Sequence, residues 1–582
     1  MKINLVNENY RSNYVENLLK ARGIVDIEEY FRPTAKNLQS PLNLKNIRMA
    51  AVLYQRIVKA GGHILIVVDS DCDGFTSAAI MYQYTKRLNP ECPVDYWLHE
   101  GKQHGLQDHI DKLMNDNYEY DLIILPDSSS NDIHYHDMLE EIHTPCLILD
   151  HHETDVKLSD NAVVVNNQLS PDYTNKDLTG AGVVYQFCRY IDSVNGTDWA
   201  DDYMDLAAVG VIGDMGSMLS MENRYLAYTG LSVKYIQNAF LKAVLEKQAY
   251  SITGQMGASW STIVEKTDAI AIAFYVVPLI NAMIRVGSME EKELLFLAFI
   301  DGSRLVPCNK RGAKGTMERA DIEAVRVCTN AKSAQNRMKE KAVEKLEAKI
   351  FKYDLLENKV LFVRLDEDDV FPAELNGLIA TQLASKYKKP TIVARLNSEG
   401  FNRGSARGLN QSELKDFRQF LLNTDMFEYA QGHANAFGVS IPDHKLRDFH
   451  TYANEALSTI DFGENAYDVN FCRNAYDADL GALICDIGEA GGIWGQNCSE
   501  PLVHITNIKV DPAAIRIMGT NKDTVRIDCN GISFLKFKAS DFIAEVQAQG
   551  KPFTIEVVGR CNLNEWGGRV TPQIFIDDYD IQ

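Results

Sequence analysis

Apolar and polar residues alternate along the chain in a pattern that predicts a parallel sheet. From His63 to about residue 240, short runs rich in Val, Ile and Leu alternate with stretches of helical periodicity, which is the pattern of βαβ units. The run from Ile64 to Val68 predicts a buried strand, and similar runs end at Asp127 and Asp150. We therefore expect an α/β fold around a parallel sheet.

The pattern changes further along the chain, and 582 residues exceed what a single hydrophobic core supports. We expect a helical N-terminal extension over 1–60 and the parallel-sheet domain over 61–330. A connector helix over 331–355, with a narrow apolar stripe, should lead to a second α/β domain over 356–465. Short strands separated by turn residues over 480–582 predict a small β-barrel of the OB type.

Acidic side chains follow the first predicted strand, where Asp69, Asp71 and Asp73 alternate before Gly74. The carboxyl ends of parallel strands meet at one edge of a sheet, and α/β proteins bind ligands there. Three carboxylates this close repel one another unless a cation neutralises them, so a metal site competes with a solvated acidic turn. The spacing imitates an EF-hand loop, but a strand precedes it and Ile80 holds the place of the bidentate glutamate. The EF-hand interpretation therefore fails.

Other segments supply further metal-ligand side chains. Asp127 ends the second acidic strand, His151 ends the third, and Asp214 lies beside glycines in a helical run. Carboxylates with a histidine and no thiolate suit Mn²⁺ or Mg²⁺ better than structural zinc, and this many acids suggests two ions. Two such ions activate water and stabilise charge on a phosphoryl group, so the sequence predicts phosphoester hydrolysis. Asp127 stands alone on its strand and is the candidate to bridge the ions.

Composition limits the classes of function and the compartment. The formal net charge of −21 argues against indiscriminate attraction to nucleic acid, although a local basic groove is compatible with it. The 11 cysteines are scattered without a C-x-x-C pair, so we expect reduced thiols and no disulfide framework or thiolate zinc site. No targeting segment stands out, and no apolar run is expected to approach the roughly 18 residues of a membrane span. We expect a cytoplasmic protein that does not bind membranes.

Four motifs, DSDCDG, PDSSSND, DHH and GVIGD, are similar to those of the DHH phosphoesterase superfamily. Within it, the chain resembles the RecJ family of single-strand-specific 5′→3′ DNA exonucleases over nearly its whole length. PLINAMIRVG, then GSAR and GHANAFG, then WGQN, GRCNLNEWGG and QIFI occur in the family's order. The resemblance implies an α/β protein in which a DHH-type parallel-sheet domain is joined by a long helix to a DHH-associated α/β domain, with a C-terminal OB-type β-barrel.

The resemblance also implies a role for each candidate residue. The expected metal ligands are Asp71, Asp73, Asp127, His151 and Asp214, with Asp127 bridging and Asp69 ligating or orienting nearby. His152 would contact the scissile phosphate, and Asp150 would fix the orientation of a histidine, so the expected catalytic set is Asp69, Asp127, Asp150, His151 and His152. The residues expected to hold the substrate's terminal phosphate or to line its groove are Asn281, Arg285, Ser405, Arg407 and His433.

The chain departs from the family pattern at two places. It has His104-Gly105-Leu106 where G-Y-G-L is usual, and three serines and an asparagine after Asp127 where the family commonly has Asn-Gly. Both departures lie near the expected site, and they bear on substrate placement more than on metal binding. His104 is therefore a further candidate for substrate contact.

The function expected from these observations is a 5′→3′ exonuclease with two Mn²⁺ or Mg²⁺ ions, acting on single-stranded DNA in recombination or repair. We expect a monomer that works with a helicase or a single-strand-binding protein. One alternative is a DHH hydrolase of short oligoribonucleotides or cyclic dinucleotides, but such relatives generally lack the barrel predicted over 480–582. Another is a non-catalytic DHH replication scaffold, and the intact ligand set weighs against it.

Overall fold

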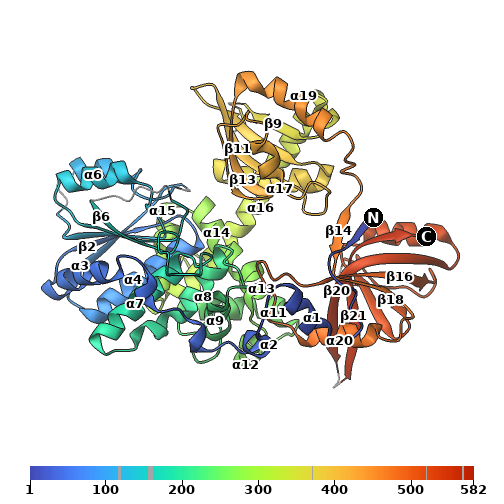
Figure 1. Cartoon of the computed structure of the whole chain (residues 1–582), viewed down its shortest axis with the longest axis horizontal. Coiled ribbons are helices and arrows are strands. Elements are labelled where there is room, and N and C mark those ends of the chain that lie inside the picture. The colour runs from blue at the N-terminus through green and yellow to red at the C-terminus, as the bar shows by residue number, and fades with distance from the viewer. Residues whose placement is uncertain are drawn as a thin grey trace. The chain divides into compact units, whose positions relative to one another are not determined.

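The computed structural model describes residues 1–101, 103–115, 119–154, 161–366, 368–369, 371–519, 521–566 and 569–582. These residues fall into two compact units, which are described in turn (Figure 1). We call Glu28–Gln335 together with Gly492–Ser499 the parallel-sheet unit. The multi-sheet unit comprises Met1–Ile27, Asn336–Gly491 and Glu500–Gln582.

A parallel sheet forms the centre of the parallel-sheet unit. Its strand order is β3-β2-β4-β5-β6, and every neighbouring pair is parallel. All five residues of β2 are buried, as are those of β4 and β5, because helices cover both faces of the sheet. The strand bounds are β2 Ile64–Val68, β3 Val94–Leu98, β4 Leu122–Pro126, β5 Cys146–Asp150 and β6 Ala162–Asn166. The predicted α/β class is confirmed.

Helices lie on both sides of this sheet. Helices α3, α4 and α7 cover one face, and α6 lies on the other (Figure 1). Leu113 of α5 and Leu139 of α6 pack with Leu65 and Ile123 of the sheet in one hydrophobic cluster. The helices of this layer are α3 Ile47–Ala60, α4 Cys72–Leu88, α5 Ile110–Asn115, α6 Ile133–Glu141 and α7 Gly180–Asn195.

A helical region completes the parallel-sheet unit. Its elements after α2, Ile27–Phe31, are α8 Met204–Gly213, α9 Met221–Gly230, α10 Ala239–Lys247, α11 Ala249–Thr253, α12 Trp260–Glu265, α13 Ala269–Ala271, a π-helix η4 Ile272–Val276, α14 Val277–Val286, α15 Met289–Asp301, and the strands β7 Leu305–Pro307 and β8 Met317–Arg319. Ser288 caps α15, and Glu291 completes a capping box there.

One stretch in this region corrects an expectation from the sequence. Ala269–Val286 has a mean hydropathy of 2.0 over 18 residues, so its length and composition would allow it to cross a membrane. The expectation that no apolar run reaches that length is therefore wrong. Because 56% of the stretch is buried inside the protein, its apolar character is accounted for by packing in the core.

Two larger sheets and a strand pair form the multi-sheet unit. The first sheet has the order β12-β13-β11-β10-β9, and the second, mixed sheet has the order β15-β16-β20-β21-β19-β18-β17. The first comprises β9 Leu361–Leu365, β10 Thr391–Leu396, β11 Phe401–Arg407, β12 Tyr429–His433 and β13 Ala436–Pro442, with α17 Asn376–Tyr387, α18 Phe417–Leu422 and α19 Leu446–Ala456. The second comprises β15 Phe471–Asn474, β16 Leu502–Val510, β17 Arg516–Met518, β18 Thr524–Cys529, β19 Ile532–Lys536, β20 Phe553–Trp566 and β21 Arg569–Ile581, with α20 Leu480–Glu489 and α21 Ser540–Gln549.

Two elements differ from the expected organisation. The extension over 1–60 contains α1, Tyr14–Ala21, but it begins with a strand, β1 Lys2–Leu5, which pairs in parallel with β14 Ala466–Val469. That pairing joins segments more than 460 residues apart, so no local pattern signals it. The long helix α16 covers Ala320–Lys352 and begins before the expected residue 331, because its first turns pack inside the parallel-sheet unit.

We expect Ile66→Ala to lower the free energy of unfolding of the parallel-sheet unit by about 2 to 5 kcal/mol, since Ile66 is fully buried in β2, an interior strand of the sheet. Ile322→Ala is the matched control, because Ile322 is 44% exposed on α16. Thermal or denaturant unfolding of the two variants checks this, and equal losses would contradict the burial assigned to β2.

Candidate metal centre at the sheet edge

The strand order places a switch point between β2 and β4. The chain runs from β2 outward to β3 and then returns to β4 on the other side of β2. Ligands of open α/β sheets bind where the strand order reverses in this way, at the carboxyl ends of the strands. Asp69 follows β2, Asp127 follows β4 and Asp150 ends β5, so the predicted acids lie at this edge.

Asp71 and Asp73 use their carboxylates to hold helix N-termini. Asp71 is the N-cap of α4 and accepts hydrogen bonds from the backbone N–H groups of Asp73 and Gly74, at 3.0 and 3.1 Å. Asp73 is buried and accepts from Gly180 N at 2.7 Å and Ala181 N at 3.0 Å, at the start of α7. Thr179 Oγ1 also donates to Asp73 Oδ1 at 3.1 Å.

Two glycines allow helices to approach these acids. A Cβ added to Gly180 would lie 2.3 Å from Asp127 Oδ1, and one added to Gly210 would lie 2.3 Å from Asp73 Oδ1. The sequence alone assigns no role to Thr179, Gly180, Ala181 or Gly210. The only local signals are the small residues of the TGAG and GVIG segments.

Asp127 adopts a backbone conformation that few non-glycine residues use. Its φ of 71° is left-handed, while its N–H donates to Leu149 O at 2.8 Å and the residue is 1% exposed. Strained backbone of this kind costs of order 1 to 3 kcal/mol and clusters at functional sites. The conformation turns the chain sharply at the end of β4 and leaves the carboxylate at the sheet edge.

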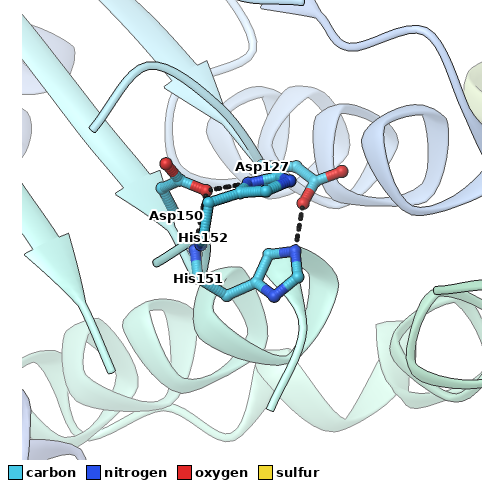
Figure 2. Close-up of side chains that lie close together, drawn as sticks. All are labelled: Asp127, Asp150, His151 and His152. Carbon is cyan, nitrogen blue, oxygen red and sulfur yellow. Dashed lines mark hydrogen bonds and ion pairs between the residues drawn. The ribbon is translucent and has the colours of Figure 1, made fainter. Parts of the chain in front are cut away.

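His151 lies among the carboxylates. Its Nε2 is 3.1 Å from Asp127 Oδ1, 3.4 Å from Asp214 Oδ2 and 4.0 Å from Asp73 Oδ2 (Figure 2 shows the first of these contacts). Asp214 caps the C-terminus of α8, which brings it to the same place from the helical region. Burial, together with the neighbouring His152, lowers the pKa of His151 to about 4, so the imidazole is neutral and keeps a lone pair for a ligand.

Asp150 and His152 form a second contact at the same edge. The buried Asp150 accepts through Oδ1 from the N–H of His151 at 2.7 Å and contacts His152 Nδ1 at 2.8 Å (Figure 2). Burial alone would lower the pKa of His152, but the hydrogen bond to Asp150 outweighs it and raises the pKa to about 10. The His152 side chain is 51% exposed, so a positively charged imidazole faces the solvent.

Buried like charges raise the pKa values of the central acids. Burial is the largest cause for each: it raises the pKa of Asp73, with help from Asp71, to about 6, and it raises the pKa of Asp127 well above its ordinary value. The pKa of Asp69, which is 1% exposed, is also raised by burial, although the hydrogen bond from His104 opposes this shift. Carboxylates in such a setting are costly to ionise without a compensating positive charge.

The donor atoms fit a divalent cation. Among the described residues, Asp69 Oδ1, Asp127 Oδ1 and His151 Nε2 are buried and have no hydrogen-bond partner. Potential ligand atoms lie within 4.8 Å of one another in three overlapping groups, which are Asp69, Asp71 and Asp127; Asp73, His151 and Asp214; and Asp127, Asp150, His151 and His152. Carboxylate oxygens with one imidazole suit Mn²⁺ or Mg²⁺, whereas the nearby buried Cys72 has a raised pKa and stays a neutral thiol.

Three residues expected to contact substrate also belong to the parallel-sheet unit. Asn281 and Arg285 lie on α14, and Asn281 Oδ1 accepts from the N–H of Cys72 at 3.1 Å, so Asn281 supports the start of α4. His104 Nδ1 lies 2.6 Å from Asp69 Oδ2, and the side chain of His104 is 48% exposed. The structure thus places Asn281 and His104 against the loop that carries the three acids.

The other three expected substrate residues lie on the first sheet of the multi-sheet unit. Ser405 and Arg407 are two apart on β11, so their side chains leave the same face. His433 of β12 and Arg407 pair with Ala436 of the strand between them, in one row across the sheet. The structure therefore brings Ser405, Arg407 and His433 onto one face.

Comparison with known proteins assigns the chain to a family. The model of the DHH family N-terminal domain matches residues 63–211, and that of the RecJ OB domain matches residues 481–578. The SPbeta prophage-derived single-strand DNA-specific exonuclease YorK of Bacillus subtilis (strain 168), itself a provisional assignment, is 34% identical over 100% of this chain and 98% of its own length. The chain belongs to the DHH family. It is a RecJ-like member of that family.

More distant relatives agree with this DHH-family assignment. The single-stranded-DNA-specific exonuclease RecJ of Bacillus subtilis (strain 168) is 22% identical over 97% of this chain and 67% of its own length. The solved structure of RecJ in complex with Mn²⁺ from Thermus thermophilus has a TM-score of 0.72 at 19% identity, covering 100% of this chain and 79% of that one. The expected RecJ-like fold, with its OB domain, is confirmed.

The buried Asp73 gives the metal-free protein a defined pH dependence. Its pKa is about 6 when folded against an ordinary 3.8, so the folded state binds more protons between these values and loses stability as pH rises through them. In the presence of a chelator, the free energy of unfolding of wild type should fall by about 3 kcal/mol between pH 4 and pH 7, relative to that of Asp73→Asn. This is because one pKa unit corresponds to about 1.4 kcal/mol. Denaturant unfolding of both proteins across this pH range measures the change. If the difference between their free energies of unfolding does not vary with pH, the burial of the Asp73 carboxylate is contradicted.

Proposed function

We propose that this RecJ-like protein is a metal-dependent exonuclease that hydrolyses phosphodiester bonds of single-stranded DNA from the 5′ end. One observation carries the proposal: three buried ligand atoms that have no hydrogen-bond partner in the described part of the chain, Asp69 Oδ1, Asp127 Oδ1 and His151 Nε2, lie at the switch point of the sheet. The relatives named single-strand DNA-specific exonucleases support the reaction and the substrate.

Asp71, Asp73, Asp127, His151 and Asp214 are the residues that would hold two divalent cations, and Asp127 would be the ligand that both ions share. Solved RecJ structures from Thermus thermophilus in complex with Mn²⁺ and with Mg²⁺ support this choice of metal. Bound there, such cations would lower the pKa of water and offset negative charge on the phosphate. Asp69, with one oxygen held by His104, would complete the ligand set or orient it.

The chain's own residues supply the remaining electrostatics of the reaction. Asp150 fixes His152 through Nδ1, and the His152 side chain is half-exposed, so its Nε2 is available to donate a hydrogen bond to a non-bridging phosphate oxygen. Because the pKa of His152 is about 10, the imidazole carries this proton at neutral pH. A positioned cationic donor stabilises the charge that develops on the phosphate in the transition state.

Residues of each unit are proposed to contact the substrate. In the parallel-sheet unit, Arg285 of α14 would bind phosphate, since an arginine fork suits its oxygens. In the multi-sheet unit, Ser405 and Arg407 would bind phosphate, and His433 on the same face would line the strand's path. The C-terminal domain that matches the RecJ OB domain would add affinity for single strands. A role in recombination or repair, a helicase or single-strand-binding partner, a monomeric state and a cytoplasmic location follow only from the resemblance and are part of the proposal.

The central test is a time course with Mn²⁺ on single-stranded DNA labelled at either end, with wild type and Asp127→Asn. We expect stepwise loss from the 5′ end by wild type. The variant should lose turnover by at least about a hundredfold, because a neutral amide cannot offset the charge of bound cations. Asp111→Asn is the matched control, an exposed acid on α5 of the same unit.

Other substrates in the same assay separate the alternatives. Cleavage of a dinucleotide alone would move the protein to the short-oligonucleotide branch of the superfamily. Absence of cleavage by a folded, metal-loaded wild type would favour the non-catalytic scaffold. Full activity of Asp127→Asn would contradict the role of Asp127.

A second test addresses the multi-sheet unit. We expect Arg407→Ala to raise KM for 5′-phosphorylated single strands by about tenfold or more, since a hydrogen bond to a charged group contributes about 1.5 to 3 kcal/mol. Arg364→Ala is the control on the same sheet, because Arg364 is 48% exposed, pairs with Asp443 at 3.1 Å and lies in one row with Gly404, on the face opposite Arg407. An unchanged preference for 5′-phosphate in Arg407→Ala would remove Arg407 from the proposed phosphate site.

A further inference from the structure

We propose that His104 and its loop form a clamp that sets the orientation of the Asp69 carboxylate, so that His104 is a positioning residue of the acidic centre. The proposal rests on the function proposed above. It gives His104 a task other than holding substrate, which is the role that its place in the sequence suggests.

The His104 imidazole contacts the carboxylate of Asp69. Asp69 Oδ2 lies 2.6 Å from His104 Nδ1, while Oδ1 is buried and has no hydrogen-bond partner among the described residues. The terminal torsion of an aspartate is soft, so one short hydrogen bond to an imidazole carried by an anchored loop favours one plane of the carboxylate. Because His104 holds Oδ2, Oδ1 stays available as a metal ligand beside the carboxylates of Asp71 and Asp127.

The loop that carries His104 is anchored by the two residues that follow it. Gly105 has a left-handed φ of 67°, and a Cβ there would lie 2.3 Å from Asp132 Oδ2 and 2.6 Å from Ser129 Oγ. The next residue, Leu106, is fully buried in the sheet's hydrophobic cluster, and its N–H donates to Asp132 Oδ2 at 3.3 Å. His104 therefore precedes a segment that is fixed by packing, by a hydrogen bond and by a close backbone approach.

Asp132 links this loop to the loop that carries Asp127. Ser129 Oγ donates to the same Asp132 Oδ2 at 2.8 Å, and Ser129 has an unusual φ of 78°. The N–H of Ser130 donates to Asp150 Oδ2 at 3.0 Å. One carboxylate oxygen of Asp132 thus joins the loop of His104 to the loop after β4, which in turn is tied to Asp150.

A consequence of this linkage is that the two departures from the RecJ pattern form one structural unit. His104-Gly105-Leu106 and the serine-rich loop after Asp127 meet at Asp132. We expect a change in either loop to alter the orientation of the Asp69 carboxylate, because both loops support His104. Metal-ligating groups commonly depend on such supporting hydrogen bonds, whose loss weakens metal affinity by about 10- to 100-fold.

The test compares two substitutions that each replace one ring nitrogen of His104. The side-chain amide of His104→Asn can reach the place of Nδ1, whereas that of His104→Gln can reach the place of Nε2. A clamp that acts through Nδ1 predicts rescue by Asn and not by Gln. A residue that holds substrate through Nε2 predicts the reverse.

The measurements are Mn²⁺ affinity by electron paramagnetic resonance of free Mn²⁺, single-strand affinity in a chelator by fluorescence anisotropy, and kcat and KM. We expect His104→Ala and His104→Gln to weaken Mn²⁺ binding by about tenfold and to lower kcat, with KM and single-strand affinity changed less than about twofold. His104→Asn should stay within about threefold of wild type. Asp132→Asn should also weaken Mn²⁺ binding, as His104→Ala does.

The control is His134→Ala, an exposed histidine on α6 that should change none of these quantities, and thermal unfolding verifies that every variant folds. Unchanged Mn²⁺ affinity in folded His104→Ala would overturn the clamp, as would loss of single-strand affinity rescued by Gln. Suppose that neither wild type nor any variant cleaves DNA, but His104→Ala and His104→Gln bind Mn²⁺ more weakly than wild type and His104→Asn. The clamp then stands and the proposed exonuclease function fails. If wild type cleaves DNA and the variants show no such difference in Mn²⁺ affinity, the exonuclease function stands and the clamp fails.

Discussion

The electrostatic cost of gathering buried carboxylates at one sheet edge is the constraint on which the rest of the parallel-sheet unit depends. Asp69, Asp73 and Asp127 are each 1% exposed, and they belong to overlapping groups of close ligand atoms that also include Asp71 and Asp214. Desolvation and mutual repulsion both oppose their ionisation, and both raise their pKa values. Such an arrangement is stable as a set of anions only if positive charge lies among them.

The fold offsets part of this cost with backbone dipoles. The N-termini of α4 and α7 point their N–H groups at Asp71 and Asp73, and helix N-termini carry partial positive charge. Gly180 lets α7 approach Asp127, and Gly210 lets α8 approach Asp73. Asp150 is compensated differently, by a charged His152. Among the described residues, Asp69 Oδ1 is buried without a hydrogen-bond partner, and Asp127 Oδ1 and His151 Nε2 contact only other members of the acidic centre, so these are the atoms that a cation would satisfy.

The parts of the site that the sequence predicts are those carried by single segments. The buried strand before Asp69 and the strands that end at Asp127 and Asp150 are local patterns, and the parallel arrangement follows from the βαβ alternation. Contacts between distant segments carry no such signal. Thr179 is 106 residues from Asp73, and His104 is 35 residues from Asp69. The parallel pairing of β1 with β14 is a third case, because a four-residue run is too short to indicate its partner.

Crystals of the wild-type protein grown with Mn²⁺, with diffraction recorded at the manganese absorption edge, test the account most directly. The account predicts anomalous density in contact with Asp127 Oδ1 and His151 Nε2, at the edge between β2 and β4. Density at other places only, with these atoms bonded to water or to each other, would contradict the claim that the buried acidic centre is built to hold a divalent cation.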